Sequence, residues 1–271
     1  MMGAPRELLT RVADIARRAS REILEVYNSG QFAASVKADA SPLTAADLRA
    51  HGLIVQGLRA LTPQLPVLSE ESDPSSFAER SRWGRYWLVD PLDGTREFLA
   101  RNGQFTVNIA LIDAHVPALG VVHVPVTDTG YQGLPGMGAW RQEAGGTCRE
   151  IRVAARCAPA VRVVGSRSHA GDSLAAFLER LGPHELLSVG SALKLCMVAE
   201  GAADVYPRLG PTSEWDTAAA HAVVAAAGGV VSDLGGAPLA YNTRAELVNP
   251  FFVAYGPQDH DWLALLRKHP R

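Results

Sequence analysis

The chain has 271 residues, of which 47% are hydrophobic and 20% are charged, and its formal net charge is −2. This length allows about two ordinary domains or one large one, and the balanced composition excludes collagen-like and disordered proteins. Because the charge is close to neutral and no basic run occurs, we exclude polymeric nucleic acid as a partner.

Apolar residues at intervals of three and four predict an amphipathic helix over residues 6–27 and a second helix from near Ser41 to about Ala60. Segments rich in β-branched and aromatic residues then predict strands at 66–71, 86–90, 105–112 and 118–126. Residues 130–146 contain six glycines and indicate a hairpin turn region. Residues 72–82 are typical of an exposed loop.

After about residue 158 strands and helices alternate. Strands are predicted at 161–166, 185–189, 203–208 and 230–233, and helices at 172–182, 191–201 and 214–229. Such alternation is typical of an α/β unit with a largely parallel or mixed sheet. We therefore predict an N-terminal α+β domain with an antiparallel sheet over residues 1–158 and a C-terminal α/β domain over residues 159–271.

The three cysteines, Cys148, Cys157 and Cys196, are odd in number and lack the spacing of a metal-binding motif. With no secretory signal in the sequence, we expect reduced thiols and a cytoplasmic protein. The longest apolar stretch, residues 222–231, is too short and too rich in glycine to cross a bilayer of roughly 30 Å. Peripheral association with the inner membrane stays open as an alternative, as does the choice between monomer and homodimer.

Acidic residues occur where predicted strands end or predicted helices begin: Asp47, Glu70, Glu71, Asp90, Asp93 and Asp216. Each has a simple structural interpretation. Asp47 and Asp216 each follow a hydroxyl residue by three positions, as in a capping box, the glutamates suit a solvated loop, and Asp-Gly is a common turn pair. If the fold brings these carboxylates together, however, they repel unless cations or protons neutralise them. Oxygen ligands without His or Cys favour Mg²⁺, with Mn²⁺ as a substitute.

The segment "DPLDGT", residues 90–95, contains oxygen atoms that can bind a metal and backbone N–H groups that can bind an anion. Asp90, Asp93 and the intervening Leu92 carbonyl can face one point across a tight turn that Pro91 stiffens. Gly94 allows close approach, and the backbone N–H groups that follow can accept a phosphate, as at a helix N-terminus. The segment therefore indicates a metal site beside an anion site.

Three segments in order, "VLSEES", "YWLVDPLDGTREF" and "EWDTAAAHAVVAAAGG", resemble the signatures of the inositol monophosphatase-like family of Mg²⁺-dependent, lithium-sensitive phosphatases. The resemblance extends from about residue 35 to residue 233. It implies a layered α-β-α-β-α sandwich, of mixed α+β and α/β character, in which the N-terminal domain holds most metal ligands and the C-terminal domain holds substrate-binding residues.

The resemblance also implies roles for individual residues. One metal, which activates water, would be held by Glu70, Asp90 and the Leu92 carbonyl, and a second by Asp90, Asp93 and Asp216. Thr95, oriented by Asp47, would position the attacking water and help to deprotonate it, so that Asp47, Glu70 and Thr95 form the catalytic set. Glu71 has no equally clear role.

Within the family, the segments "KADASPLTAAD", "VGSRSHAG" and "GSALKLCMVAEGAADVYPRLGPTSEWDTAA" are most similar to bacterial 3′(2′),5′-bisphosphate nucleotidases. A bisphosphate needs a second anion pocket. Ser191 and Lys194 lie one helical turn apart and Arg208 ends the next strand, so these three could bind the distal phosphate, beside Gly94 and Thr95. His169 could stack on the purine, by resemblance. Alternatively, Lys194 and Arg208 are surface charges and His169 is structural.

The function expected from the resemblance is Mg²⁺-dependent hydrolysis of the 3′-phosphate of adenosine 3′,5′-bisphosphate, and of its sulfated relative, to AMP and phosphate in sulfur assimilation. The substrate partner is then a small nucleotide bisphosphate. The alternative is an inositol monophosphatase or sugar phosphatase with the same metal site. A metal-dependent binding protein without turnover is a third hypothesis, and the survival of all the catalytic positions together argues against it.

Overall fold

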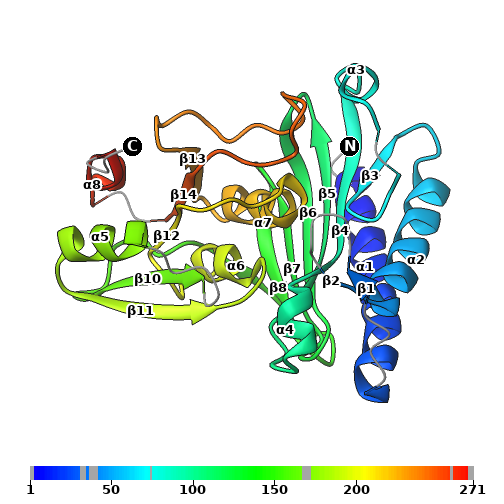
Figure 1. Ribbon diagram of the computed structural model, residues 1–271, viewed down its shortest axis with the longest axis horizontal. Helices are drawn as coiled ribbons and strands as arrows, with labels where there is room; N and C mark the ends of the chain where they lie inside the picture. The colour runs from blue at the N-terminus through cyan, green and yellow to red at the C-terminus, as the bar shows by residue number, and fades with distance from the viewer. Residues whose placement is uncertain are drawn as a thin grey trace.

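The computed structural model describes residues 3–30, 35–36, 42–73, 75–166, 172–256 and 259–267. The described elements form five alternating layers of helices and sheets (Figure 1). The outer helices α1 (Gly3–Ser29) and α2 (Ala45–Leu61) lie against the first sheet. Both match the helices predicted from the apolar spacing, and the layered arrangement confirms the predicted fold class.

The first sheet has seven strands in the order β3-β4-β5-β6-β7-β8-β9. β3 is parallel to β4, and the remaining neighbours are antiparallel. The strands are β3 (Val67–Ser69), β4 (Arg85–Asp93), β5 (Thr106–Asp113), β6 (Val116–Val124), β7 (Thr129–Leu134), β8 (Gly138–Gln142) and β9 (Cys148–Ile151). The glycine-rich region at 130–146 supplies the β7–β8 hairpin, as predicted.

The second sheet has five strands in the order β11-β10-β12-β14-β13 and is mixed, as expected from the alternation. β10 pairs in parallel with β11 and β12, whereas β14 is antiparallel to both of its neighbours. The strands are β10 (Val161–Ser166), β11 (His184–Val189), β12 (Val205–Arg208), β13 (Val230–Asp233) and β14 (Phe252–Tyr255).

Two helices, α6 (Leu193–Ala199) and α7 (Glu214–Ala226), lie between the sheets, and α5 (Asp172–Leu181) and α8 (Trp262–Arg267) cover the far side of the second sheet. Alternation along the strands explains the layering, because successive side chains point to opposite faces. On β4, Trp87 and Val89 join the core beneath α1 and α2, whereas Tyr86 and Leu88 join the core shared with α6 and α7. A third core fills the space beneath α5 and α8.

The expectation of an exposed loop at residues 72–82 is wrong for its second half. Residues Phe77–Arg80 form the short helix α3, and Arg80 is only 2% exposed. Its guanidinium donates to Asn242 Oδ1 and to the Ala245 carbonyl. A local pattern could not indicate this burial, because the partners lie more than 160 positions away along the chain.

The remaining described elements are the paired segments β1 (Ser35–Val36) and β2 (Pro42–Leu43) and the helix α4 (Thr95–Leu99). No element was predicted for β9, β14 or α8. The strands of the first sheet fall within residues 67–151 and those of the second within 161–255, but α7 packs on the first sheet. The division of the chain into domains at residue 158 stays a prediction.

Candidate active site

Three carboxylates predicted from separate motifs meet at one point. Oxygen atoms of Asp90, Asp93 and Asp216 all lie within 4.8 Å of one another. Asp90 is 1% exposed, whereas Asp93 and Asp216 are partly exposed. Asp90 and Asp93 come from the end of β4, and Asp216 comes from the first turn of α7. The fold therefore joins residues that are 126 positions apart in the sequence (216 − 90).

The end of β4 is shaped to present these groups. The β4–β5 register is interrupted between Asp90 and Asp93, and the Leu92 N–H donates to Asp90 Oδ1 at 3.0 Å. Gly94 follows with φ 91°, and a Cβ there would lie 3.2 Å from the Gln104 carbonyl. Glycine suits this left-handed, crowded turn because it has no Cβ.

Asp93 is held by groups from two other segments. Its Oδ2 accepts from the Ala192 N–H at 2.6 Å and from Asn108 Nδ2 at 3.2 Å, with Thr106 Oγ1 at 3.5 Å. None of these three residues was predicted from the sequence to belong to the site. A signal existed for two of them: Thr106 and Asn108 alternate along an otherwise apolar strand, so both point to the same face.

Asp216 is both a capping residue and a member of the acidic cluster. Its Oδ2 accepts from Thr212 Oγ1 at 2.6 Å and from the Ser213 N–H at 3.0 Å. The segment before α7 is in turn fixed by Asn249, which donates to the Ser213 carbonyl at 2.8 Å and to Thr217 Oγ1 at 2.9 Å. The capping interpretation and the clustering are therefore compatible.

The proximity of these acids changes their proton affinity. Burial, and then the charges of Glu70, Asp93 and Asp216, raise the pKa of Asp90 well above its ordinary value. Burial, and then Asp216, raise the pKa of Asp93 to about 7. Burial raises the pKa of Asp216 against the opposing bonds from Thr212 and Ser213. Mutual repulsion of this kind is relieved by protons or by cations.

Asp47 lies in the first turn of α2 and Thr95 begins α4, and the two are not hydrogen-bonded to each other within the described part of the chain. Asp47 Oδ2 accepts from the Thr44 N–H at 2.7 Å and from Thr44 Oγ1 at 2.6 Å, which confirms the capping box. The Thr95 hydroxyl donates to the Leu92 carbonyl at 3.4 Å. Burial raises the pKa of Asp47, and the charge of Glu71 adds to that shift.

Glu70 follows β3, and its N–H donates to the Val89 carbonyl at 3.1 Å, which places it beside the end of β4. Its charge acts on Asp90. The charge of Glu71 acts instead on Asp47 and His51. The two adjacent glutamates thus face different groups.

The predicted anion-binding residues lie next to the acidic cluster. Lys194 is 8% exposed, and its Nζ donates to the Ser191 carbonyl at 2.6 Å. Burial lowers the pKa of Lys194 to about 8, partly offset by Asp93, and Arg208 lowers it further. Arg208 donates to the Pro211 carbonyl. The interpretation of Lys194 as a solvated surface charge is therefore wrong, because the side chain is buried.

Several buried polar atoms near the acidic cluster and the predicted anion-binding residues lack hydrogen-bond partners among the described residues. Among the described residues, Ser191 Oγ, Arg208 Nε and Asn108 Oδ1 are buried and make no hydrogen bond. Ser191 has φ 51°, an unfavourable backbone conformation for a residue with a Cβ. His169 lies outside the described residues, so its predicted stacking role stays a prediction.

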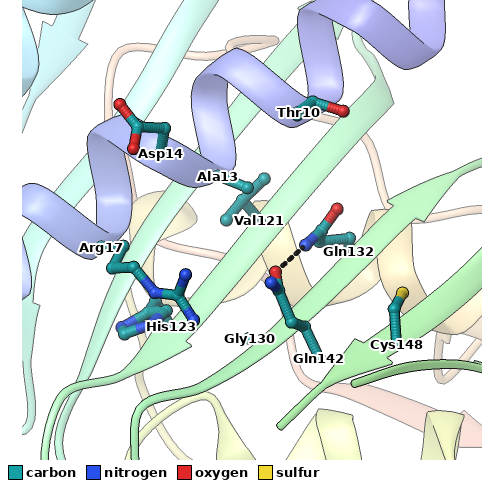
Figure 2. Close-up of a pocket in the computed structure, with 10 residues that line it drawn as sticks. All are labelled: Thr10, Ala13, Asp14, Arg17, Val121, His123, Gly130, Gln132, Gln142 and Cys148. Atoms are coloured by element: carbon teal, nitrogen blue, oxygen red, sulfur yellow. Dashed lines mark hydrogen bonds between the residues drawn. The ribbon is translucent and has the colours of Figure 1, made fainter. Parts of the chain in front are cut away.

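A separate cavity of about 320 Å³ lies between α1 and strands β6 to β9 (Figure 2). None of the predicted site residues that the structure describes lines it. Arg17, on its wall, donates to Asp128 Oδ1 at 2.9 Å and to Oδ2 at 3.2 Å, and His123 Nε2 lies 3.1 Å from the same Oδ1. Because Arg17 is already paired with Asp128, the described lining offers no unpaired cation to a phosphate.

Comparisons with known proteins extend over nearly the whole chain. The model of the inositol monophosphatase family matches residues 5–269. The 3′(2′),5′-bisphosphate nucleotidase CysQ of Escherichia coli (strain K12) is 53% identical over 246 residues, which is 90% of this chain and 98% of that protein. Residues 5–269, which the family model matches, include both sheets and every candidate site residue.

Solved structures show the same fold. The crystal structure of CysQ from Bacteroides thetaiotaomicron has a TM-score of 0.81 and 40% identity, and the match covers 92% of this chain and 97% of that chain. The extragenic suppressor protein suhB from Bartonella henselae has a TM-score of 0.79 and 26% identity over 96% of this chain and 97% of that chain.

Proposed function

Because this chain belongs to the inositol monophosphatase family, we propose that it hydrolyses the 3′-phosphate of adenosine 3′,5′-bisphosphate to give AMP and phosphate. Its Escherichia coli relative is named a 3′(2′),5′-bisphosphate nucleotidase, which supports a nucleotide bisphosphate as the substrate. The observation that carries the proposal is the hydrogen bond from the Ala192 N–H to Asp93, because it attaches the Ser191–Lys194 segment directly to the acidic cluster. Adenosine 3′-phosphate 5′-phosphosulfate, the sulfated relative, is a second substrate in this proposal, which places the enzyme in sulfur assimilation.

The acidic cluster fits divalent cations. Its donors are oxygens, its carboxylates repel one another, and hard cations with oxygen ligands relieve that repulsion. The residues proposed to hold Mg²⁺, or Mn²⁺ in its place, are Glu70, Asp90, the Leu92 carbonyl, Asp93 and Asp216. When bound, such ions lower the pKa of a coordinated water and stabilise charge on the attacking and leaving oxygens.

Thr95 and Asp47 are proposed to handle the proton of the attacking water. The Thr95 hydroxyl accepts the proton of the water and passes its own proton to the Asp47 carboxylate. To do so, the hydroxyl rotates away from the Leu92 carbonyl, to which it donates at 3.4 Å. Burial, by raising the pKa of Asp47, makes this carboxylate a better base. The new bond joins the water oxygen to phosphorus, the bond from phosphorus to the 3′-oxygen breaks, and the 3′-oxygen takes a proton from solvent.

The second phosphate is proposed to bind to Ser191, Lys194 and Arg208. Ser191 Oγ and Arg208 Nε are buried donors without hydrogen-bond partners among the described residues, and such atoms usually have a partner. Lys194 adds a buried positive charge. Gly94 and Thr95 are proposed to contact the phosphate that is cleaved, and His169 to stack on the purine.

Substrate pairs that differ by one phosphate test this assignment. Replacing Arg208 or Lys194 with Ala should lower kcat/KM for adenosine 3′,5′-bisphosphate by about 10- to 100-fold, since a charged hydrogen bond contributes roughly 1.5–3 kcal/mol. The loss should be much smaller for adenosine 3′-monophosphate, which lacks the 5′-phosphate. Arg18→Ala, at an exposed position on α1, is the control. Equal losses on both substrates would refute the second anion pocket.

The proposal also includes the division into domains, the location of the enzyme and its oligomeric state. The N-terminal domain, residues 1–158, would supply most metal ligands and the C-terminal domain, residues 159–271, the substrate-binding residues. No helix among the described residues is long and apolar enough to cross a membrane. A cytoplasmic enzyme that acts as a monomer or homodimer completes the proposal.

A further inference from the structure

A second group of potential metal ligands lies outside the acidic cluster. Ligand atoms of Cys157, Asp259 and His260 are all within 4.8 Å of one another. Cys157 lies in the segment that leads from the first sheet into β10, and Asp259 and His260 immediately precede α8. Cysteine spacing gives no indication of this group, because Cys157 lies about 100 positions before the other two residues.

The three side chains are held in place by their surroundings. The Cys157 N–H donates to Asp259 Oδ2 at 3.1 Å, which orients the carboxylate. The His260 ring stacks on Trp262 with 4.8 Å between ring centroids and 13° between the planes, and Trp262 is 2% exposed. An imidazole packed flat against a buried indole keeps its ring plane, and oriented ligands of this kind favour metal binding.

One ligand atom lacks a partner. Among the described residues, His260 Nδ1 is buried and makes no hydrogen bond, and it lies 3.7 Å from Asp259 Oδ1, beyond hydrogen-bond distance. Buried ring nitrogens usually have a partner. An ion between the imidazole and the carboxylate would give this ring nitrogen a partner.

The ligand chemistry selects the metal. Thiolate, imidazole and carboxylate are the three side-chain ligands that Zn²⁺ uses, whereas Mg²⁺ prefers oxygen alone. The side chains of Asp259 and His260 are 43% and 35% exposed, so an ion can enter and a water can complete a tetrahedral shell. The group thus differs in kind from the all-oxygen cluster of the active site.

We propose that Cys157, Asp259 and His260 bind one Zn²⁺ ion, with water as the fourth ligand. Two of the ligands precede α8 and the third precedes β10, so the ion joins the two ends of the second half of the chain. Metal binding of this kind stabilises the folded state, because unfolded chains rarely present a formed site. The site has a structural role, independent of phosphate hydrolysis.

Cobalt(II) titration of the metal-free protein tests the proposal, because a thiolate bound to Co²⁺ gives a charge-transfer absorption that an oxygen-only site cannot give. We expect this band to saturate at one Co²⁺ per chain, to persist in Asp90→Asn, and to disappear when Zn²⁺ is added. If the wild-type protein gave no such band, the proposal would be wrong, and no variant at the site would be needed to show it.

Matched cysteine variants assign the ligand. Cys148→Ser, at an exposed thiol on β9, should keep the band, whereas Cys157→Ser should lose it. In the Asp90→Asn background, Zn²⁺ should raise Tm, and His260→Gln should reduce that increase and weaken Zn²⁺ binding by at least about tenfold in a competition with a chelator. A band that survives in Cys157→Ser would contradict the assignment.

Discussion

Asp90 is the most buried member of the acidic cluster and faces the charges of Glu70, Asp93 and Asp216. We expect Asp90→Asn to lower Mg²⁺-dependent phosphate release by about 1,000-fold or more, since a bound metal contributes several kcal/mol to the stabilisation of charge. In the absence of metal the same variant should have a higher Tm than the wild-type protein, because a repelling buried charge has been removed. Phosphate release and thermal unfolding in EDTA measure the two effects.

Asp113→Asn is the matched control, since Asp113 ends the neighbouring strand β5, is partly exposed and pairs with Arg85. It should change neither activity nor Tm appreciably, because exposed ion pairs contribute little. If Asp90→Asn retained wild-type phosphate release, the metal assignment of the cluster would be wrong.

His221 on α7 makes stability depend on pH. Burial lowers its pKa from 6.5 to about 4, and its Nδ1 lies 2.9 Å from the Tyr241 hydroxyl. The unfolded chain therefore binds a proton at this residue below pH 6.5 while the folded chain does not, so the contribution of His221 to stability falls as pH drops from 6.5 towards 4. The loss between pH 6.5 and pH 5 is about 2 kcal/mol.

Urea unfolding at several pH values should show that lowering the pH from 6.5 to 5 reduces stability less in His221→Gln than in the wild-type protein. Some dependence should remain, because burial also lowers the pKa of His123 to about 4. The exposed residue His184 provides the control, and His184→Gln should leave the slope unchanged. An identical slope in His221→Gln and wild type would show that His221 titrates equally in both states.

At the scale of elements, α7 contacts the first sheet closely enough that a side chain cannot enter. A Cβ at Gly120 on β6 would lie 2.1 Å from the Ala219 carbonyl of α7. Gly120→Ala should thus displace the helix that carries Asp216, at a cost of about 1–3 kcal/mol in stability. We also expect a higher Mg²⁺ concentration for half-maximal activity.

Gly130→Ala on β7 is the control, because a Cβ there would meet nothing closer than 3.6 Å. Its unfolding free energy and Mg²⁺ dependence should resemble those of the wild-type protein. Equal effects of the two substitutions would mean that close packing of α7 does not position Asp216.

The segment before β14 connects α3 to α7 through one residue. Asn242 Nδ2 donates to the Arg80 carbonyl at 2.6 Å, and the Asn242 N–H donates to Glu214 Oε2 at 2.8 Å. Asn242 has φ 56°. Asn242→Gly keeps this backbone conformation and removes the side-chain bonds, so it should destabilise the protein by about 1–3 kcal/mol.

Asn242→Ala should cost about 1–2 kcal/mol more than Asn242→Gly, since alanine adds the strain of a positive φ. Chemical denaturation of both variants separates the two contributions. If alanine were no worse than glycine, backbone strain at this residue would not affect stability.

Local patterns predicted most of the elements because the information is local. The apolar spacing of α1 and the β-branched segments of β4 to β6 depend on near neighbours in the sequence. α3, β14 and α8 were missed because they are short and are stabilised by distant contacts, such as Arg80 with Asn242. The structure of these elements depends on tertiary contacts, which local sequence patterns do not indicate.

At the scale of the whole molecule, the acidic cluster lies where the end of β4 meets the start of α7 and the segment before α6. Chemistry alone suggested a metal site at Asp90 and Asp93, but only the family resemblance joined Asp216 to them. The bond from the Ala192 N–H to Asp93 could not be predicted, because every residue has a backbone N–H and no sequence pattern marks this one. The Cys157 group was missed for a related reason: its ligands have no common motif.

The central claim is that one acidic cluster and the adjacent basic residues select a nucleotide bisphosphate. The most direct measurement compares kcat/KM, in Mg²⁺, for adenosine 3′,5′-bisphosphate, inositol 1-phosphate, fructose 1,6-bisphosphate and AMP. The account predicts a preference of about 100-fold or more for the adenosine bisphosphate, equivalent to about 2.7 kcal/mol of transition-state discrimination. A preference for inositol 1-phosphate or the sugar phosphate would contradict the proposed specificity, and no release from any substrate would contradict the enzyme itself.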